Sequence, residues 1–183
     1  MNATLQSLEK KLAEAVGGLD SARMQARLPR KWSIQQVVEH LILSYSATEA
    51  VLTSRISKGR PTQARRSLAQ HCGQIYVIRL GYFPRGVSAP DEVTPSDDSP
   101  PLPGEQLASI AAEHLVRMDA LLDRTSDLFG DRERSVSHVI LGPLSPPQWR
   151  KFHLVHGLHH IKQIQATRKR SSLSAPDLDP PNS

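Results

Sequence analysis

One stretch of twelve residues, from His153 to Ile164, constrains the fold of this chain more than any other. Four of the eight histidines lie in its first eight residues. The apolar side chains in and around it recur at helical rather than strand spacing, and they are Trp149, Phe152, Leu154, Val155, Leu158, Ile161 and Ile164. At about 100° per residue, His153, His156 and His160 project within roughly 60° of one another. The stretch therefore predicts a helix that carries a stripe of histidines.

Two of these histidines have the spacing of a metal-binding pair. His156 and His160 are four residues apart, so two imidazoles can reach one divalent ion from one helix face. His40 lies at the edge of the inner face of another predicted helix and would supply a third nitrogen ligand. Such a site leaves at least one position for water or substrate, and it suits zinc, nickel, copper or iron. Gln163 either orients a ligand from outside the site or has a capping or solvent-exposed role.

The remaining histidines leave several interpretations open, since a single histidine on an apolar face is more often a hydrogen-bonded core residue than a ligand. His153 is a fourth ligand, a base that faces the substrate, or an exposed residue. His114 lies on the inner stripe of its helix, as a reserve ligand or as a buried hydrogen-bonded residue. His159 is a surface residue or a group that supports the site. His71 and His138 carry no specific signal.

Apolar periodicity predicts a helical protein of one domain. Five segments have helical patterns, at about 4–16, 34–57, 63–81, 105–129 and 146–168. Ser33 and Gln36 form a capping box at the start of the second segment, and Ser145 with Pro146 has the pattern of a helix start. We expect an all-α protein, a four-helix bundle with an extra N-terminal helix. Residues 1–170 form its single domain, and the Ser-, Pro- and Asp-rich residues 171–183 form a disordered C-terminal tail.

Three segments between and within these helices carry further expectations. Segment 63–81 is expected to bury a stripe that includes Leu68, Cys72 and Ile75. Residues 83–104 are rich in proline and cannot form a helix or a central strand, so they predict a long loop laid over the bundle surface. Residues 136–144 predict a short apolar connector to the last helix.

Composition limits the partners and the compartment. The net charge of +5 permits nucleic-acid binding, but Lys and Arg are scattered along the chain, so no nucleic-acid partner is expected. Cys72 is the only cysteine, which rules out a disulfide within the chain and fits a reducing cytoplasm. No apolar run approaches about 18 residues, and the polar N-terminus lacks the apolar core of a signal peptide. A cytoplasmic location without membrane contact is therefore expected.

Four motifs in order resemble those of one protein superfamily. The pattern of Trp32-Ser33 followed by His40-Leu41, with His156-x-x-x-His160-x-x-Gln163-Ile164 far downstream, resembles the DinB-like superfamily of metal-binding four-helix bundles. The segments Phe83–Pro95 and Leu141–Trp149 are similar to those of a poorly characterised branch of it, as is the doubled histidine His159-His160.

The resemblance spans about Ser33 to Gln165 and implies a fold and a metal site. The implied fold is an up-down-down-up bundle, often a homodimer. The implied site holds a divalent transition metal ion, zinc or nickel, on three histidines. Carried over by position, these are His40, His156 and His160, the same three that helical geometry selects.

Two functions follow from these expectations. The first is a metal-dependent transferase or hydrolase that activates a thiol or a water toward a small-molecule or thiol substrate, as related S-transferases, isomerases and hydrolases do. In it, His153 or His159 would shuttle a proton. The alternative is a non-catalytic, metal-stabilised bundle that binds a ligand or partner, with the proline-rich loop and residues 136–144 as its surface.

Overall fold

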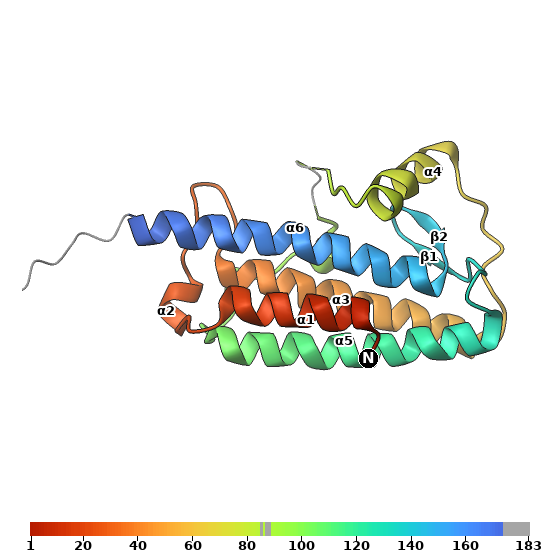
Figure 1. Ribbon diagram of the computed structural model, residues 1–183, viewed down its shortest axis with the longest axis horizontal. Coiled ribbons are helices and arrows are strands. Elements are labelled where there is room, and N and C mark those ends of the chain that lie inside the picture. The colour runs from red at the N-terminus through yellow and green to blue at the C-terminus, as the bar shows by residue number, and fades with distance from the viewer. Residues whose placement is uncertain (85, 87–88, 174–183) are drawn as a thin grey trace, which may run out of the picture.

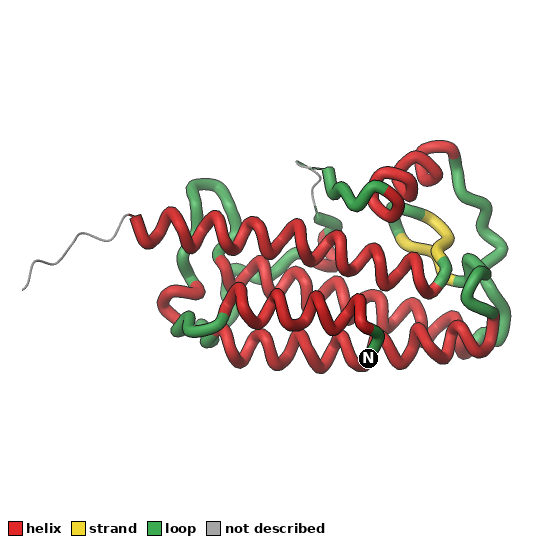
Figure 2. The backbone as a smooth tube through the Cα atoms, in the orientation of Figure 1, coloured by secondary structure: helices red, strands yellow, loops and turns green. Residues whose placement is uncertain are grey.

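The computed structural model describes residues 1–84, 86 and 89–173, and four long helices form its body. These helices are α1 (Ala3–Val16), α3 (Ile34–Ser57), α5 (Gly104–Phe129) and α6 (Pro146–Leu173). Figure 1 shows α1 and α6 running in one direction and α3 and α5 in the opposite one. This is an up-down-down-up bundle, and Figure 2 shows how little of the described chain is strand. The predicted all-α class is confirmed.

The N-terminal helix is a member of the bundle and not an addition to it. Helix α1 packs against α5 and α6, and it buries Leu5, Leu8 and Leu12. At Gly157 of α6, a Cβ atom would lie 2.4 Å from Leu8 Cδ1, so the absence of a side chain lets the two helices approach closely. The expectation of an extra N-terminal helix is therefore wrong in one respect, because α1 takes the bundle position that the segment 63–81 was expected to fill.

The segment 63–81 forms a shorter helix that lies outside the bundle. Helix α4 (Leu68–Gln74) continues directly into a π-helical turn, η1 (Ile75–Arg79). The expected buried stripe is wrong, since Leu68 is 85% exposed and Cys72 is also exposed. Periodicity identified a helix here, but the neighbour of this helix is a small hairpin, which covers little of its surface.

That hairpin occupies the predicted connector. Strands β1 (Val136–His138) and β2 (Gly142–Leu144) pair antiparallel, with His138 opposite Gly142. The Gln74 amide donates to the carbonyl oxygens of Leu141 at 2.8 Å and Pro143 at 3.0 Å, which fastens α4 to the hairpin. Together, α4, η1 and the hairpin form a cap at one end of the bundle (Figure 1).

The proline-rich segment crosses the bundle as the sequence predicts, with one short 3-10 turn, η2 (Asp91–Val93). The side chain of Gln35 in α3 holds it, because this amide donates to the Pro100 carbonyl oxygen and accepts from the Leu102 N–H. Its position brings Val93 next to His40. Residues 85, 87 and 88 of the segment lie outside the described residues.

The helix ends agree with the local sequence signals. Both hydrogen bonds of the capping box between Ser33 and Gln36 are present. The connector before it contains one short helix, α2 (Ser21–Met24). Helix α6 continues to Leu173, so it includes the first three residues of the predicted tail, and the remaining residues, 174–183, lie outside the described part.

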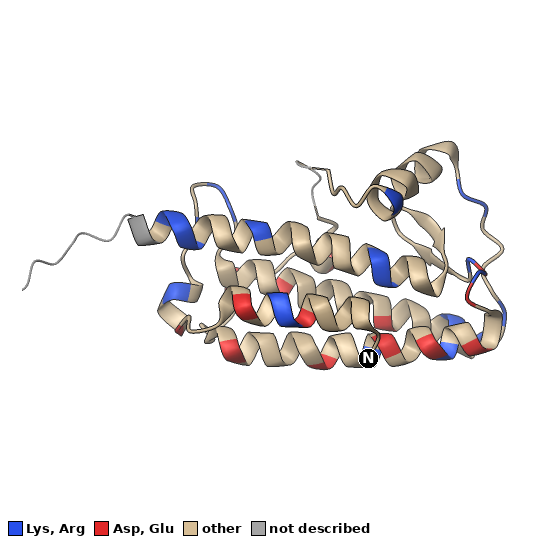
Figure 3. Cartoon of the chain, viewed as in Figure 1, with Lys and Arg blue, Asp and Glu red and all other residues tan. Residues whose placement is uncertain are grey.

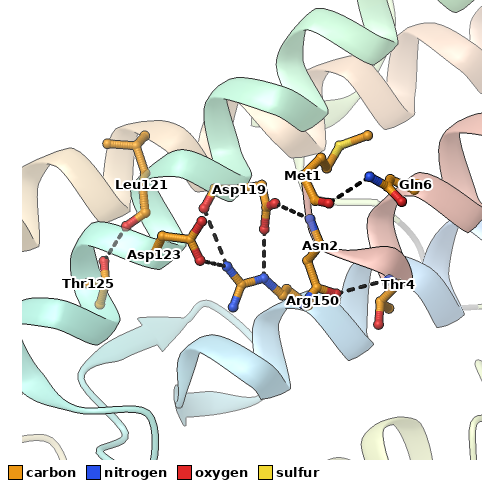
Figure 4. Close-up of polar contacts among 9 residues, drawn as sticks. All are labelled: Met1, Asn2, Thr4, Gln6, Asp119, Leu121, Asp123, Thr125 and Arg150. Atoms are coloured by element: carbon orange, nitrogen blue, oxygen red, sulfur yellow. Dashed lines mark hydrogen bonds and ion pairs between the residues drawn. The ribbon is translucent and has the colours of Figure 1, made fainter.

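Charge is distributed unevenly between two bundle helices. Helix α6 contains six Lys and Arg residues and no acidic residue, whereas acidic residues predominate on α5 (Figure 3). Figure 4 shows where they meet, as Arg150 of α6 reaches Asp119 and Asp123 of α5. Among the helices of the described residues, none has the length and apolar character that crossing a membrane requires.

Candidate metal centre

The structure brings together the three histidines that the sequence selects as a set. His40 extends from α3, and His156 and His160 extend from consecutive turns of α6. The Nε2 atom of His156 lies 3.1 Å from Nε2 of His40 and 3.0 Å from Nε2 of His160. One ligand atom from each residue lies within 4.8 Å of the others, and all three side chains are buried. This group, called the histidine triad below, could hold a metal ion.

Hydrogen bonds on the far side of two rings determine where their protons lie. His40 Nδ1 is 2.7 Å from the carbonyl oxygen of Val93, which can only accept, so Nδ1 carries the proton. His160 Nδ1 lies 3.0 Å from Gln163 Oε1 and donates to it in the same way. The Nε2 atoms of His40 and His160 therefore both present lone pairs toward His156. Each ring is oriented by an outer partner, as is usual for metal-binding histidines.

The third ring cannot satisfy both of these lone pairs. A neutral His156 has one ring proton, and on Nε2 it can be donated to only one of the two facing nitrogens. Its Nδ1 atom is buried and has no hydrogen-bond partner among the described residues. The triad thus gathers nitrogen lone pairs that its own protons cannot pair. A cation placed among them would pair with all three, so the residues present fit a metal ion.

Burial keeps the triad in the protonation state that a metal requires. Removal from water lowers the pKa of His160 to about 3, with the nearby His40 adding to the effect. The pKa of His156 is lowered well below its usual range, first by burial and then by its histidine neighbours. Burial also lowers the pKa of His40, against the opposing effect of its bond to Val93. Near pH 7 all three are neutral ligands.

A cavity of about 1100 Å³ opens beside the triad, and all three histidines contribute to its wall. Much of the remaining wall is aromatic and aliphatic, with Trp32, Phe83, Val93, Leu141, Trp149 and Phe152 among its residues. The rings of Trp32 and His40 have centroids 5.1 Å apart, and those of Phe83 and His156 are 5.0 Å apart. An ion held by the triad would therefore face a space with room for a small molecule.

The structure separates His153 from the triad. His153 is 0% exposed, so the exposed interpretation is wrong. Thr48 gives its hydroxyl proton to the Ser44 carbonyl oxygen at 2.9 Å, so at 3.1 Å it accepts from His153 Nε2. His153 is not among the three residues whose ligand atoms converge. His153 is therefore a core residue, one turn before His156, and its hydrogen bond to Thr48 links α6 to α3.

The other candidate residues also have defined positions. His114, the reserve ligand, is paired with Glu49, with Nδ1 2.7 Å from Oε1, and lies outside the triad. His159 lines the cavity, and its Nε2 accepts from the Gln163 amide at 2.9 Å. Gln163 therefore contacts both His159 and His160, which is the orienting role that the sequence left open.

Two residues of the site carried no signal in the sequence. Val93 contributes a backbone carbonyl, and such an acceptor is independent of side-chain type. His138 lines the cavity from the hairpin, where its ring packs against Phe152 with centroids 4.4 Å apart. In the sequence, only its position three residues before Leu141-Gly142 suggests that it lies at a turn. Strands of three residues are too short to show an alternation of apolar and polar residues.

Comparison with known proteins identifies the family. The sequence model of the DinB superfamily matches residues 4–164, from the second residue of α1 to the triad helix. Searches among curated proteins and among solved structures give no match. The matched region includes α3 and α5, most of α1 and α6, and all three triad histidines, in agreement with the resemblance of the motifs. The chain belongs to the DinB superfamily.

Proposed function

We propose that this protein is a metal-dependent enzyme, a transferase or hydrolase that uses a thiol or a water as its nucleophile. The observation that carries the proposal is the convergence of three neutral imidazoles, with unpaired lone pairs, on the wall of a large cavity. A purely structural metal site is closed by four protein ligands, whereas a catalytic site keeps one position open. Among the described residues, no fourth His, Cys, Asp or Glu joins this group.

His40, His156 and His160 would hold a divalent transition metal ion, with zinc and nickel as the ions to test first. Such an ion, when bound, supplies Lewis-acid activation of the nucleophile or the substrate. The chain itself orients the ligands, through Val93 for His40 and Gln163 for His160. Of the two proton shuttles considered, His159 fits better than His153, because it lines the cavity beside His160.

The apolar wall would exclude water around a bound substrate and so strengthen electrostatic interactions there. The phenyl rings of Phe83 and Phe152 both contact His156, at centroid separations of 5.0 Å and 5.4 Å. They leave the triad facing an apolar space, which favours a small organic substrate over a highly charged one.

A paired activity screen tests this proposal. Metal-loaded wild type is assayed for thiol transfer to 1-chloro-2,4-dinitrobenzene and for hydrolysis of 4-nitrophenyl esters, beside His160→Ala and the control His71→Ala. His71 lies on α4, away from the triad. We expect activity in wild type and in the control, and a loss of at least about 100-fold in His160→Ala. Full activity in a metal-free His160→Ala protein would contradict the proposal.

A non-catalytic binding module is the second candidate, and one observation favours it. Large apolar side chains are exposed on the α4–hairpin cap, with Leu80 64% and Val139 78% exposed, and such groups mark surfaces that contact partners. Cobalt(II)-substituted protein separates the two functions. Visible bands that shift when a small thiol is added indicate an open position and catalysis, and unchanged bands indicate a closed structural site.

A further inference from the structure

His138 is the one histidine of the cavity wall that neither holds the triad together nor touches it directly. It is the last residue of β1, and it lines the cavity together with two aromatic residues that its ring contacts. The ring centroid is 4.4 Å from that of Phe152 and 5.2 Å from that of Trp149. Because Phe152 also contacts His156, this phenyl ring touches both His138 and the triad.

The backbone of the hairpin turn determines which nitrogen of His138 carries the proton. The N–H groups of Ile140 and Leu141 both donate to Nδ1, at 3.0 Å and 3.1 Å. A nitrogen that accepts two hydrogen bonds has no proton of its own, so the proton lies on Nε2. Burial lowers the pKa of His138 to about 4, which keeps the ring neutral near pH 7. Among the described residues, Nε2 has no hydrogen-bond partner.

The hairpin holds this donor in place. Gln74 fastens one strand to α4 through the carbonyls of Leu141 and Pro143. The indole N–H of Trp149 donates to the Val136 carbonyl oxygen at 3.3 Å, which fastens the other strand to α6. A donor fixed by its surroundings loses little freedom when a ligand binds, so it contributes more to affinity and orientation than a mobile one.

We propose that the Nε2–H of His138 binds the carbonyl oxygen of an uncharged, largely apolar substrate that occupies the cavity beside the triad. The proposal deepens the proposed function, because it names a substrate class for the same cavity. A neutral donor beside Phe152, Trp149 and Leu141 matches a neutral acceptor, since none of these three residues supplies a charge that would compensate a carboxylate for its lost hydration. His138 would then position the substrate relative to the nucleophile and would set specificity for a carbonyl group.

Two probes of equal shape test this role. Benzophenone has a carbonyl oxygen where 1,1-diphenylethylene has a CH₂ group, so their affinities differ mainly through one hydrogen bond. Binding is measured by calorimetry on the full-length chain as purified and again after chelation. We expect wild type to bind the ketone about 3–10-fold more tightly than the alkene in both states, the usual net effect of one hydrogen bond.

Two variants at the same position make the test specific. His138→Phe keeps the aromatic packing and removes the donor, so both probes should bind with a ratio near one. His138→Asn can accept from the same turn N–H groups through Oδ1 and still offers an N–H, so it should restore part of the preference. His71→Phe, which changes a histidine outside the cavity wall, should leave the wild-type ratio unchanged.

Several results would overturn the proposal. Wild type could bind neither probe, or could bind benzophenone and 1,1-diphenylethylene with equal affinity. His138→Phe could keep the wild-type preference for the ketone, or wild type could bind diphenylacetate more tightly than benzophenone. A preference that disappears on chelation would assign the carbonyl to the ion instead of His138. Long-range ¹⁵N–¹H spectra of labelled histidine report the tautomer of His138 without any variant. A proton on Nδ1 would contradict the proposal. Absence of metal from the protein would remove the proposed function but would leave the probe ratio unaffected.

Discussion

Helix α6 carries two polar clusters, which differ in whether every buried polar atom has a hydrogen-bond partner. In the first, Arg150 Nε donates to Asp119 Oδ1 at 2.7 Å, and Nη2 donates to Asp123 Oδ1 at 2.5 Å (Figure 4). The other oxygen of Asp119 accepts from the Asn2 N–H at 2.6 Å, which ties the start of α1 to α5. Each carboxylate faces a donor, so this cluster is complete without any ligand.

In the histidine triad, about two turns further along α6, some buried nitrogen atoms have no hydrogen-bond partner. Its central nitrogens face one another at 3.0–3.1 Å, and His156 Nδ1 has no partner among the described residues. Buried polar atoms are normally paired, so an unpaired group that is otherwise well ordered calls for an explanation. The first cluster is satisfied by the fold itself, whereas the second has unpaired nitrogen atoms and could hold a metal ion.

The largest expected loss of stability comes from removing a carboxylate partner of Arg150. Asp119→Ala leaves Arg150 buried without its buried carboxylate partner, so the free energy of unfolding should fall by about 3–5 kcal/mol. Asp123→Ala is the matched control. Asp123 is 68% exposed, so its loss should cost less than about 1 kcal/mol. Urea denaturation measures both, and equal losses in the two variants would contradict the assignment of Asp119 as the structural partner.

A metal ion that binds the histidine triad should stabilise the folded protein. At a free metal concentration of about 100 times Kd, the ion should raise the free energy of unfolding of wild type by about 2.7 kcal/mol. His156→Ala/His160→Ala should show no such increase, while Asp123→Ala should show all of it. Thermal melts with and without zinc or nickel provide the measurement. An equal increase in the double variant would place the ion elsewhere.

A smaller effect should follow from the outer partner of His160. Gln163→Ala removes the acceptor that orients this ring, and loss of such a partner typically lowers metal affinity 10–100-fold. The side chain is exposed, so we expect a value of about 10-fold, near the lower end. Competition with a chromophoric chelator measures the affinity. Gln165→Ala, two residues further along α6 and outside the cavity wall, should leave the affinity unchanged, and an equal loss there would contradict an orienting role.

A separate effect is the loss of stability in acid that depends on His153, which links α3 to α6. Burial lowers its pKa to about 3 in the folded chain, whereas in the unfolded chain it titrates near 6.5. Between these values the unfolded state binds more protons, so stability is complete above about pH 6.5 and falls as the pH decreases toward 3. One such residue contributes at most about 1.4 kcal/mol per pH unit. His153→Gln should therefore lose stability less steeply than wild type between pH 6.5 and 5, and parallel curves would contradict this.

Local signals in the sequence predicted much of the bundle and the grouping of the site. The capping box at Ser33 gave the start of α3, because both of its hydrogen bonds are made within four residues. The spacing of His156 and His160 predicted their common direction, because it depends only on helical geometry. That His40 would meet them was a hypothesis of tertiary packing, supported by the family resemblance, and the structure places it there.

The features that the sequence did not predict depend on contacts between distant segments. Periodicity marked Leu68 as apolar on one helix face, but it cannot show whether another element covers that face. The hairpin is held by Gln74 and Trp149, both outside it, and its strands are too short for a pattern. The hydrogen bond from His40 to the Val93 carbonyl involves a backbone atom, which every residue type supplies.

Whether the histidine triad binds a metal ion can be decided by measuring the metal content of the protein. Untagged wild type, His156→Ala/His160→Ala and His71→Ala are reconstituted with zinc or nickel, desalted and analysed by inductively coupled plasma mass spectrometry. We expect about one ion per chain in wild type and in His71→Ala, and almost none in the double variant. A wild-type protein without metal, or a double variant with as much metal as wild type, would contradict this expectation.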